Sequence, residues 1–433
     1  MRTNIIYEGA DELTYEIREI VKVAEQIEKT GVLISWENIG DPIAKGEKVP
    51  EWIKDIVSDI VKNDNGSFGY SPTKGLLATR EYIAKERNLE GGIQITAEDI
   101  LFFNGLGDAI SKVYTYLNSK ARVIGPNPAY STHSSAEAAH ADAPHITYKL
   151  DPLNSWYPNL SDMRAKIEAN KNICGILIVN PDNPTGMVYP EEVLRKIVDL
   201  AREFKLFIIS DEIYSNLFYE GVKHKKLASV LGDVPGLAMR GISKEFPWPG
   251  SRCGWVEFYN TDKDADFARY AKTLLDAKML EVCSTTLPQK ALPRVMSDPK
   301  YYPYLAERNK MYERKADMAY EIFSKIPELI VHKPKGAFYM TLVFKDGVLN
   351  SKQKLIPANP EAGKIIENIS DTKQLDKRFV YHLLASRGIC VVPLSSGFNS
   401  DLFGFRITLL EQDEQKFKKI VETVAEAVRE YVK

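Results

Sequence analysis

The chain has 433 residues, of which 44% are hydrophobic and 27% are charged, and its formal net charge is −2 at pH 7. This length allows two or three domains with a sizeable core. The near-neutral charge, without basic blocks, argues against a nucleic-acid or polyanion partner. The longest apolar runs, such as residues 173–179, are far too short to span a membrane.

The N-terminus carries early acidic residues and no apolar signal core, so we expect a cytoplasmic protein. No CxxC pair or HExxH pattern occurs, so we expect neither a disulfide framework nor a metal site. The four cysteines lie far apart at Cys174, Cys253, Cys283 and Cys390.

The N-terminal part alternates between predicted helices and loops. Helical spacing over 11–30 is followed by a short apolar strand that runs into Gly40. Gly40 is either a simple turn glycine or a residue that offers its backbone N–H to a substrate. A second amphipathic helix over 51–62 leads to a loop that contains Tyr70, and that residue alone suggests packing.

From Ile95 onward the order becomes strand, loop, helix, which indicates a parallel sheet with covering helices. Ligands of such sheets bind beyond the carboxyl ends of the strands. Gly105-Leu106-Gly107 opens a helix after the first strand, and such an N-terminus can bind phosphate. This glycine pattern alone is weak, because any turn between a strand and a helix can carry it.

Other polar residues follow the next strands. Asn183 comes after the apolar segment 173–179, and Asp211 and Tyr214 come after 206–210. A carboxylate at the end of a buried strand is costly without a partner. A protonated pyridine nitrogen would be a suitable partner for Asp211.

Lys244 and Arg252 lie in a loop rich in glycine and proline after a further strand-like segment. A lysine that loses hydration there can act as an amine nucleophile and form a Schiff base. Arg252 is a planar cation suited to a phosphate. Together they suggest pyridoxal phosphate, an aldehyde that carries a phosphate. Two surface cations in an ordinary loop are the alternative.

A different topology is predicted from about residue 304. A long charged helix precedes a strand pair around Gly336, and two more strands and a closing helix over 412–432 end the chain. The polar segment 345–375 is predicted to be an irregular surface insertion.

With these residues placed, the chain resembles the class I/II aminotransferases, the fold-type I pyridoxal-phosphate enzymes. The resemblance rests on the motifs YSPTKG, PNPAYSTH, NPDNPTG, DEIY, S-K-x5-G-x-R-x-G and FGFRITLL, in the family's order. It implies an α/β fold with a seven-stranded, mainly parallel sheet between helices and a smaller α+β domain. The implied division is an N-terminal segment 1–48 that packs with the small domain, a large cofactor domain 49–303 and a small domain 304–433.

The resemblance also implies residue roles. Lys244 would be the Schiff-base lysine, Asp211 the partner of the pyridine nitrogen, and Asn183 and Tyr214 donors to the phenolic oxygen. Arg406 and Gly40 would bind the substrate carboxylate. The other implied cofactor residues are Gly105, Leu106, Gly107, Ser243 and Arg252 around the phosphate, Tyr130 on the ring, His133 behind the aspartate, and Tyr70 reaching the phosphate of the neighbouring subunit.

One departure concerns the phosphate. Many members of the family have Ser or Thr three residues before the lysine, where this chain has Gly241.

The implied activity is a ping-pong transfer of an amino group from an alanine-like or broad range of L-amino acids to a 2-oxo acid such as 2-oxoglutarate, in a homodimer with shared active sites. Leu280 stands where dicarboxylate-specific members carry an arginine, and another cation, such as Lys278, could replace it. An aspartate aminotransferase, a carbon–sulfur β-lyase and a non-catalytic cofactor-binding sensor remain as alternatives.

Overall fold

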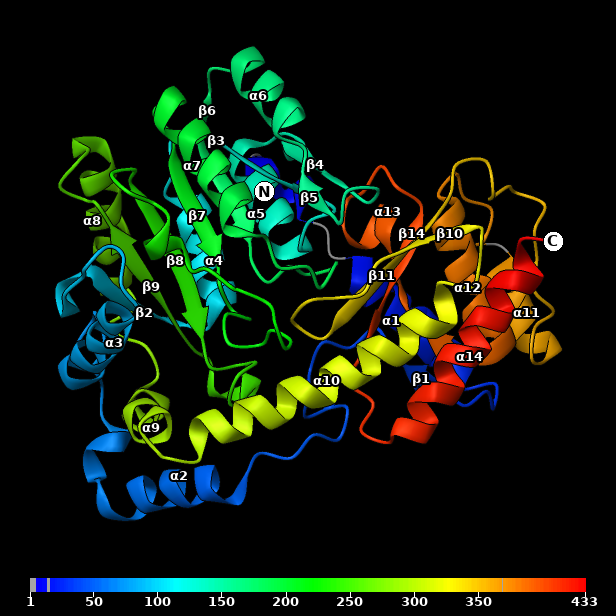
Figure 1. Ribbon diagram of the computed structural model, residues 1–433, viewed down its shortest axis with the longest axis horizontal. Coiled ribbons are helices and arrows are strands. Elements are labelled where there is room, and N and C mark those ends of the chain that lie inside the picture. The colour runs from blue at the N-terminus through cyan, green and yellow to red at the C-terminus, as the bar shows by residue number, and fades with distance from the viewer. Residues whose placement is uncertain (1–4, 14–15, 368) are drawn as a thin grey trace.

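The central feature of the computed structural model is a sheet in the order β2, β9, β8, β7, β6, β3, β4, β5 (Figure 1). The structure describes residues 5–13, 16–367 and 369–433, so residues 14 and 15 of the helix expected over 11–30 lie outside it. The strands are β2 (Ile100–Asn104), β3 (Arg122–Asn127), β4 (Thr147–Asp151), β5 (Tyr157–Pro158), β6 (Ile173–Val179), β7 (Phe207–Asp211), β8 (Gly236–Gly241) and β9 (Cys253–Tyr259).

The four pairs that join β4, β3, β6, β7 and β8 are parallel, and β9 runs antiparallel to both β2 and β8. The two-residue β5 pairs antiparallel with β4 and extends the seven expected strands at one edge. The predicted fold class is confirmed.

Helices cover both faces of this sheet. Since successive side chains of a strand point to opposite faces, they enter two different cores. On β6, Ile176 and Ile178 belong to one core, and Leu177 and Val179 to the other. The helices of this part are α2 (Glu51–Asn63), α3 (Leu77–Leu89), α4 (Leu106–Thr115), α5 (Ser131–Ala141), α6 (Leu160–Ala169), α7 (Glu191–Phe204), α8 (Ala265–Met279) and α9 (Thr286–Met296). Residues of α4 and α8 join the core of Leu177, whereas residues of α3, α6, α7 and α9 join the core of Ile176.

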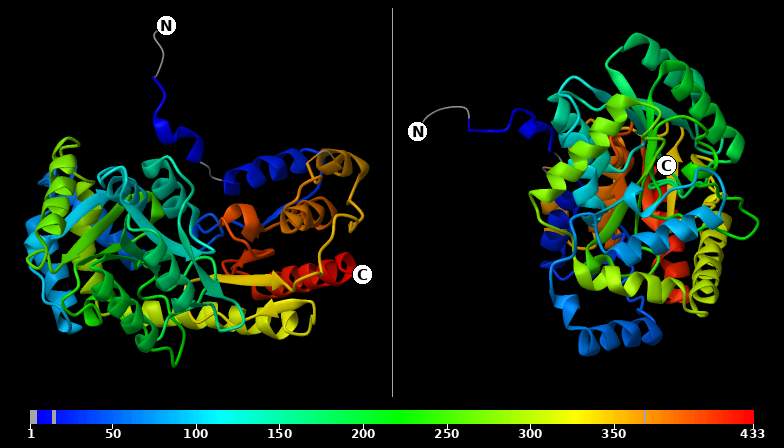
Figure 2. Two further views of the ribbon diagram at one scale, coloured as in Figure 1. Left: turned by 90° about the horizontal axis from the view of Figure 1, so that it is seen from above. Right: turned by 90° about the vertical axis from the view of Figure 1, so that its left-hand side faces the viewer.

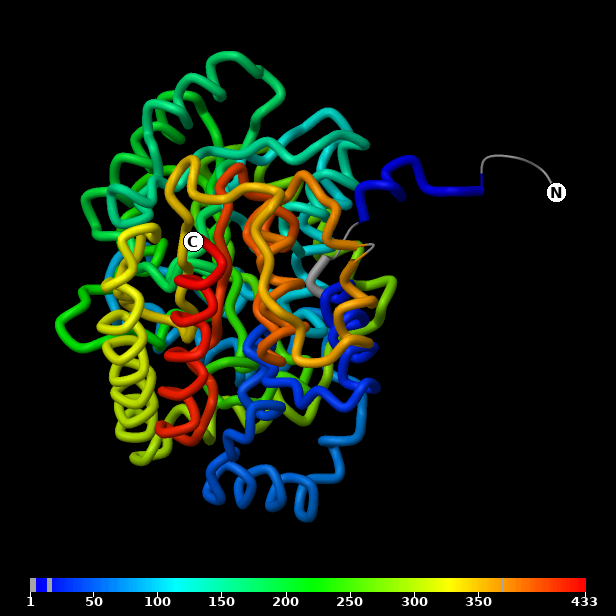
Figure 3. The backbone as a smooth tube through the Cα atoms, turned by 90° about the vertical axis from the view of Figure 1, so that its right-hand side faces the viewer, coloured from blue at the N-terminus to red at the C-terminus, as the bar shows by residue number. Residues whose placement is uncertain are grey.

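A smaller antiparallel sheet, in the order β10, β11, β14, β13, lies beside the large one (Figure 2). Its strands are β10 (Leu329–Val331), β11 (Tyr339–Phe344), β13 (Val392–Pro393) and β14 (Gly404–Thr408). The associated helices are α1 (Glu16–Glu28), α10 (Tyr301–Phe323), α11 (Pro360–Glu367), α12 (Leu375–Arg387), α13 (Leu394–Gly397) and α14 (Glu414–Tyr431). Helix α10 runs along the base of both groups of elements, and α14 packs beside it (Figures 1 and 3).

The N-terminal segment joins this second group through β1 (Ser35–Trp36), which pairs in parallel with β12 (Ile389–Cys390). We retain the division at residues 48 and 303 as a proposal.

The prediction of an irregular surface insertion over 345–375 is wrong in part, although most of these residues are exposed or half-buried. The segment contains α11, which packs against α1 and α12. Leu349, Leu355, Ala362 and Ile366 are buried in the core that also holds α12 and α14. These apolar residues are spread thinly among polar ones, so the segment has no strong periodicity, although each fills a place in the core.

Candidate active site

The carboxyl ends of β6, β7 and β8 bring residues from distant parts of the sequence to one cavity of about 400 Å³. Of the expected residues, eleven line this cavity: Gly40, Leu106, Gly107, Tyr130, Asn183, Asp211, Tyr214, Ser243, Lys244, Arg252 and Arg406. Gly105, His133 and Tyr70 do not line it. Gly105 precedes α4, and His133 lies behind Asp211.

Lys244 lies in the turn after β8, and its Nζ atom donates a hydrogen bond to the carbonyl oxygen of Gly40, 2.7 Å away. Burial lowers the pKa of Lys244 to about 8. Asp41 and Asp211 raise this pKa, while Arg406 and Arg252 lower it. The site therefore holds an amine whose neutral, nucleophilic form is accessible near neutral pH.

Asp211, the last residue of β7, is buried, and its Oδ2 atom lies 3.0 Å from Nε2 of His133. The carboxylate accepts, so Nε2 carries the proton, and Nδ1 of His133 accepts from the Tyr114 hydroxyl at 3.2 Å. Oδ1 of Asp211 accepts from the backbone N–H of Ile213 at 3.1 Å. These contacts fix the orientation of a buried carboxylate that borders the cavity.

Arg406 comes from β14 of the smaller sheet and is buried. Its Nη1 atom donates to Oδ1 of Asn183 at 3.0 Å, and its Nη2 atom donates to the carbonyl oxygen of Asn38 at 2.6 Å. The guanidinium lies over the rings of Tyr339 and Phe398, with centroid distances of 4.4 and 5.0 Å. A guanidinium held in this way can offer a fork of donors to a carboxylate.

Tyr214 and Tyr339 share a hydrogen bond of 2.9 Å between their hydroxyl groups. Tyr339 also explains Gly40, because a Cβ atom at residue 40 would lie 2.4 Å from the Tyr339 hydroxyl oxygen. The small size of Gly40 thus allows the close approach of this tyrosine.

The N-terminus of α4 and Arg252 enclose another part of the cavity. Gly105 has φ +81°, which favours glycine, and a Cβ atom there would lie 2.6 Å from Nη2 of Arg252. Leu106 and Gly107, the first two residues of the helix, line the cavity beside Arg252. This part can bind an anion with backbone N–H groups and a guanidinium.

Gly241 has a structural explanation. A Cβ atom there would lie 3.0 Å from the carbonyl oxygen of Cys253 on β9 and 3.2 Å from Cδ1 of Ile213. The close packing of β8 and β9 therefore leaves little room for the hydroxyl-bearing side chain that the family resemblance implies at this point.

The sequence analysis missed four polar residues that line the cavity: Arg18, Asn38, Asp41 and Tyr339. Arg18 belongs to α1 and Tyr339 to β11. Asp41, next to Gly40, could have been found from its neighbour, but nothing local to Arg18 or Tyr339 signals the site.

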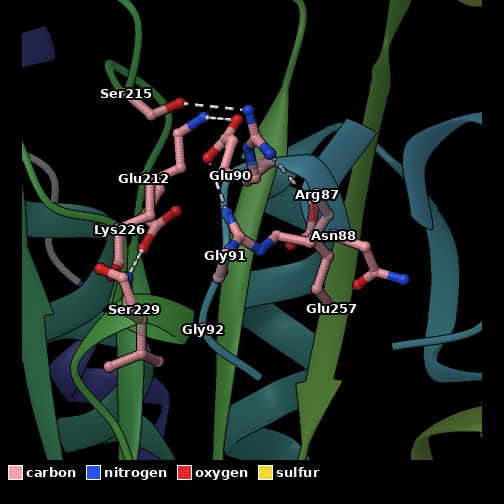
Figure 4. A network of polar contacts seen from close by, with 12 residues as sticks. Arg87, Asn88, Glu90, Gly91, Gly92, Glu212, Ser215, Lys226, Ser229 and Glu257 are labelled. Carbon is pink, nitrogen blue, oxygen red and sulfur yellow. Dashed lines mark hydrogen bonds and ion pairs between the residues drawn. The ribbon is translucent and has the colours of Figure 1, made fainter. Parts of the chain in front are cut away.

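A charged network, buried except at Glu90, lies beside the site, around β7, β8 and β9 (Figure 4). Lys226 Nζ lies 2.5 Å from Oε1 of Glu90, and Arg240 Nη1 lies 3.4 Å from Oε1 of Glu257. Oε1 of Glu212 accepts from the backbone N–H of Leu227 at 2.6 Å. These side chains do not line the cavity, and they tie together the strands that end at it.

No described helix is both long and apolar enough to cross a membrane. Within the same described ranges, no group of three or more His, Cys, Asp or Glu residues is arranged to hold a metal ion.

Comparison with known proteins gives one family. The profile described as aminotransferase class I and II matches residues 38–424. The chain is 56% identical over 433 residues to an uncharacterized aminotransferase of Methanocaldococcus jannaschii, covering 100% of both chains. It is 30% identical over 333 residues to the glutamate-pyruvate aminotransferase AlaA of Escherichia coli, covering 76% of this chain and 80% of that protein.

The fold is similar to that of a solved alanine aminotransferase from Pyrococcus furiosus, with a TM-score of 0.84 and 26% identity over 99% of this chain and 100% of that one. The profile match covers most of the chain, and the Methanocaldococcus relative matches it over its full length. This chain belongs to the class I and II aminotransferase family.

Proposed function

We propose that the enzyme transfers the amino group of alanine or a similar L-amino acid to 2-oxoglutarate by a ping-pong mechanism, with pyridoxal phosphate held in the described cavity. The observation that carries the proposal is that Lys244, Asp211 and Arg406 line the same cavity. The glutamate-pyruvate and alanine aminotransferases among the similar proteins support the choice of substrates.

The residues fit the cofactor. The absence of a Cβ at Gly105 lets the Arg252 guanidinium approach the start of α4, and the part of the cavity lined by Leu106, Gly107 and Arg252 suits the phosphate. The buried Asp211 carboxylate, oriented by His133, suits a protonated ring nitrogen. When bound, pyridoxal phosphate supplies a carbon that accepts the amino group and a ring that withdraws electrons from the substrate.

The protein's residues do the rest. Arg406 binds the substrate carboxylate bidentately and so orients the α-carbon toward Lys244. Nζ of Lys244 moves the proton at that carbon. Asp211 keeps the proton on the ring nitrogen, while Asn183 and Tyr214 bind the phenolic oxygen. We propose that His133 orients the Asp211 carboxylate.

The acceptor needs a second cation for its distal carboxylate. Lys278 is a poor candidate, because its fully buried ammonium group already lies 2.6 Å from Glu281 and 3.2 Å from Asp108. Leu280 is 84% exposed and apolar. Arg18 of α1 lines the cavity itself, so we propose that it pairs with the distal carboxylate of glutamate and 2-oxoglutarate.

We also propose a homodimer with shared sites. Tyr70 is 86% exposed and does not line the cavity of its own chain, although the family resemblance gives it a cofactor role. Exposed apolar side chains, including Phe68, Leu280 and Val282, surround the contact between the 66–73 loop and residues 282–286, where Thr73 donates to the carbonyl of Val282. Such a patch favours a protein partner.

The test is a panel of amino donors against 2-oxoglutarate with the purified enzyme. We expect alanine to be a good donor. The enzyme would instead be an aspartate aminotransferase if kcat/KM for aspartate exceeded that for alanine and for the aromatic amino acids by more than about tenfold. This ratio corresponds to about 1.4 kcal/mol of transition-state free energy. Pyruvate released from a sulfur amino acid without any 2-oxo acid would indicate a β-lyase.

A further inference from the structure

Arg308 of α10 is a buried arginine that contacts the main chain of the proposed catalytic lysine. Its Nη1 atom donates to the carbonyl oxygen of Lys244 at 2.8 Å and to that of Glu245 at 3.0 Å. Its Nε atom donates to Oε1 of Glu47 at 2.5 Å, and the Arg308 and Glu47 side chains are only 4% and 7% exposed. Tyr312, one turn along α10, donates to the other oxygen of Glu47 at 2.6 Å.

Glu47 ends a segment, residues 37–47, that we call the N-terminal strap. The strap is held at its start, where the backbone N–H of Thr408 donates to the Glu37 carbonyl at 3.0 Å. Lys45 near its end donates back to Oε1 of Glu37 at 2.8 Å. The strap also carries Gly40, whose carbonyl accepts from Nζ of Lys244. Lys244 is therefore connected to the strap twice. Its carbonyl is connected to Glu47 through Arg308, and its amine donates directly to Gly40.

The side chain of Glu245 is also anchored to α10. Its carboxylate accepts from the Tyr301 hydroxyl at 2.8 Å and from the Ser215 hydroxyl at 3.3 Å. Ser215 lies at one end of the charged network of Figure 4. Helix α10 thus holds both the carboxylate of Glu245, through Tyr301, and its carbonyl, through Arg308, while Ser215 adds a contact from the segment after β7.

A buried ion pair such as Arg308–Glu47 is weak support for stability, because desolvation of the two charges offsets much of their attraction. The geometry of the guanidinium group explains the presence of Arg308 better than a gain in stability does. A guanidinium can donate to two carbonyl oxygens and a carboxylate from one rigid plane, whereas an ammonium group is a compact charge on a flexible stem.

On the basis of the proposed function, we propose that Arg308 is a positioning residue, which joins the main chain of Lys244 to Glu47 and so keeps the amine between the strap and the cavity. Without this link, the turn after β8 would be free to shift relative to the strap. Small displacements of a reacting group are costly, since an error of about 1 Å can lower a rate by about 100-fold.

The experiment uses the full-length protein with Arg308→Met, Arg308→Lys and Glu47→Gln. The matched control is Arg314→Lys, on the same helix, where the arginine pairs with Glu414 at the surface. In the cofactor-free protein, the pH dependence of Lys244 labelling by trinitrobenzenesulfonate, followed by peptide mapping, gives the titration midpoint of the amine. Thermal unfolding, kcat and KM are measured alongside.

We expect the midpoint to rise by about half a pH unit or more in all three variants, because the amine gains water when its main chain shifts. We also expect kcat to fall about tenfold or more, with a smaller change in KM. A model in which only the charges of residues 308 and 47 affect the Lys244 midpoint predicts different results. Arg308→Lys keeps the charge and would leave the midpoint unchanged, and Glu47→Gln removes a negative charge and would lower it.

A lower or unchanged midpoint in folded Glu47→Gln would overturn the proposal, and this near-isosteric variant decides the question if Arg308→Met does not fold. A shift as large in Arg314→Lys would also overturn it. Because labelling needs neither substrate nor cofactor, a wild-type protein without transaminase activity would refute the proposed function alone and leave this result interpretable.

Discussion

Nζ of Lys244 donates a hydrogen bond to the carbonyl oxygen of Gly40, a residue 204 positions earlier in the chain. The contact links the turn after β8 to the N-terminal strap. It also places the amine at a boundary between the two groups of elements, where the cavity lies.

We expect Lys244→Ala to lower turnover by about 10⁴-fold or more, because the proton at the substrate α-carbon loses its base. The variant should still bind pyridoxal phosphate. Borohydride treatment of the wild-type holoenzyme, followed by peptide mapping, should label Lys244. Lys272→Ala, at an exposed site, is the control and should keep full activity. A label on another lysine would contradict the assignment.

The amine of Lys244 should titrate with a midpoint near pH 8 in the cofactor-free protein, because burial lowers its pKa to about 8. Labelling should therefore be slow below this pH and fast above it. Asp41 favours the charged form, so Asp41→Asn should move the midpoint downward. A wild-type midpoint near the ordinary lysine value, about 10.4, would refute this prediction.

The same shift has a consequence for stability. The pKa is lower in the folded protein than in the unfolded chain, so between these two values the unfolded chain binds more protons. The contribution of Lys244 should thus make the free energy of unfolding of the cofactor-free protein rise with pH from about 8 to about 10.4. Lys244→Met should remove this increase in denaturant titrations.

The parallel sheet explains why much of the site could be predicted. Asp211 and Lys244 follow neighbouring strands, and Asn183 follows the strand next to them, so the alternation of strand and helix already indicated that their side chains would meet. Arg18 and Tyr339 could not be found in this way. Their positions depend on how α1 and the antiparallel small sheet pack against the large one, which no local pattern encodes. The helix and the buried residues within 345–375 were missed for a similar reason. Their few apolar residues show no periodicity, and only the packing of the folded protein buries them in the core.

His133 should matter more than Tyr114, although the two are hydrogen-bonded. His133→Ala removes the hydrogen bond that orients the buried Asp211 carboxylate, so kcat should fall about 10- to 100-fold. Tyr114→Phe removes one neutral hydrogen bond and should change kcat by about fivefold at most. Steady-state kinetics on both variants, with cofactor content checked by absorbance, makes the comparison. Equal losses would show that His133 acts only through packing.

Hybrid dimers test the proposed role of Tyr70. Tyr70→Phe and Lys244→Ala homodimers should each have low activity. In a mixed dimer, one site combines the intact Lys244 of one subunit with the intact Tyr70 of the other. Mixing the two variants should therefore restore activity, up to about one working site per hybrid. Subunit exchange is verified with differently tagged chains, and exchange without recovery would argue against shared sites.

Arg18 should determine the use of glutamate and 2-oxoglutarate but not of alanine. Arg18→Met removes the cation proposed for the distal carboxylate and leaves that group facing an apolar side chain, so kcat/KM for glutamate should fall about tenfold or more, while that for alanine changes by about threefold at most. Arg18→Lys keeps a charge and should recover part of the loss. Arg406→Lys is the contrasting variant, because every substrate has an α-carboxylate, and it should lower kcat/KM for both amino acids together. Half-reactions with each amino acid, followed by the absorbance of the bound cofactor, separate these outcomes. An equal loss of kcat/KM for alanine and glutamate in Arg18→Met would mean that Arg18 affects the geometry of the cavity and does not bind the distal carboxylate.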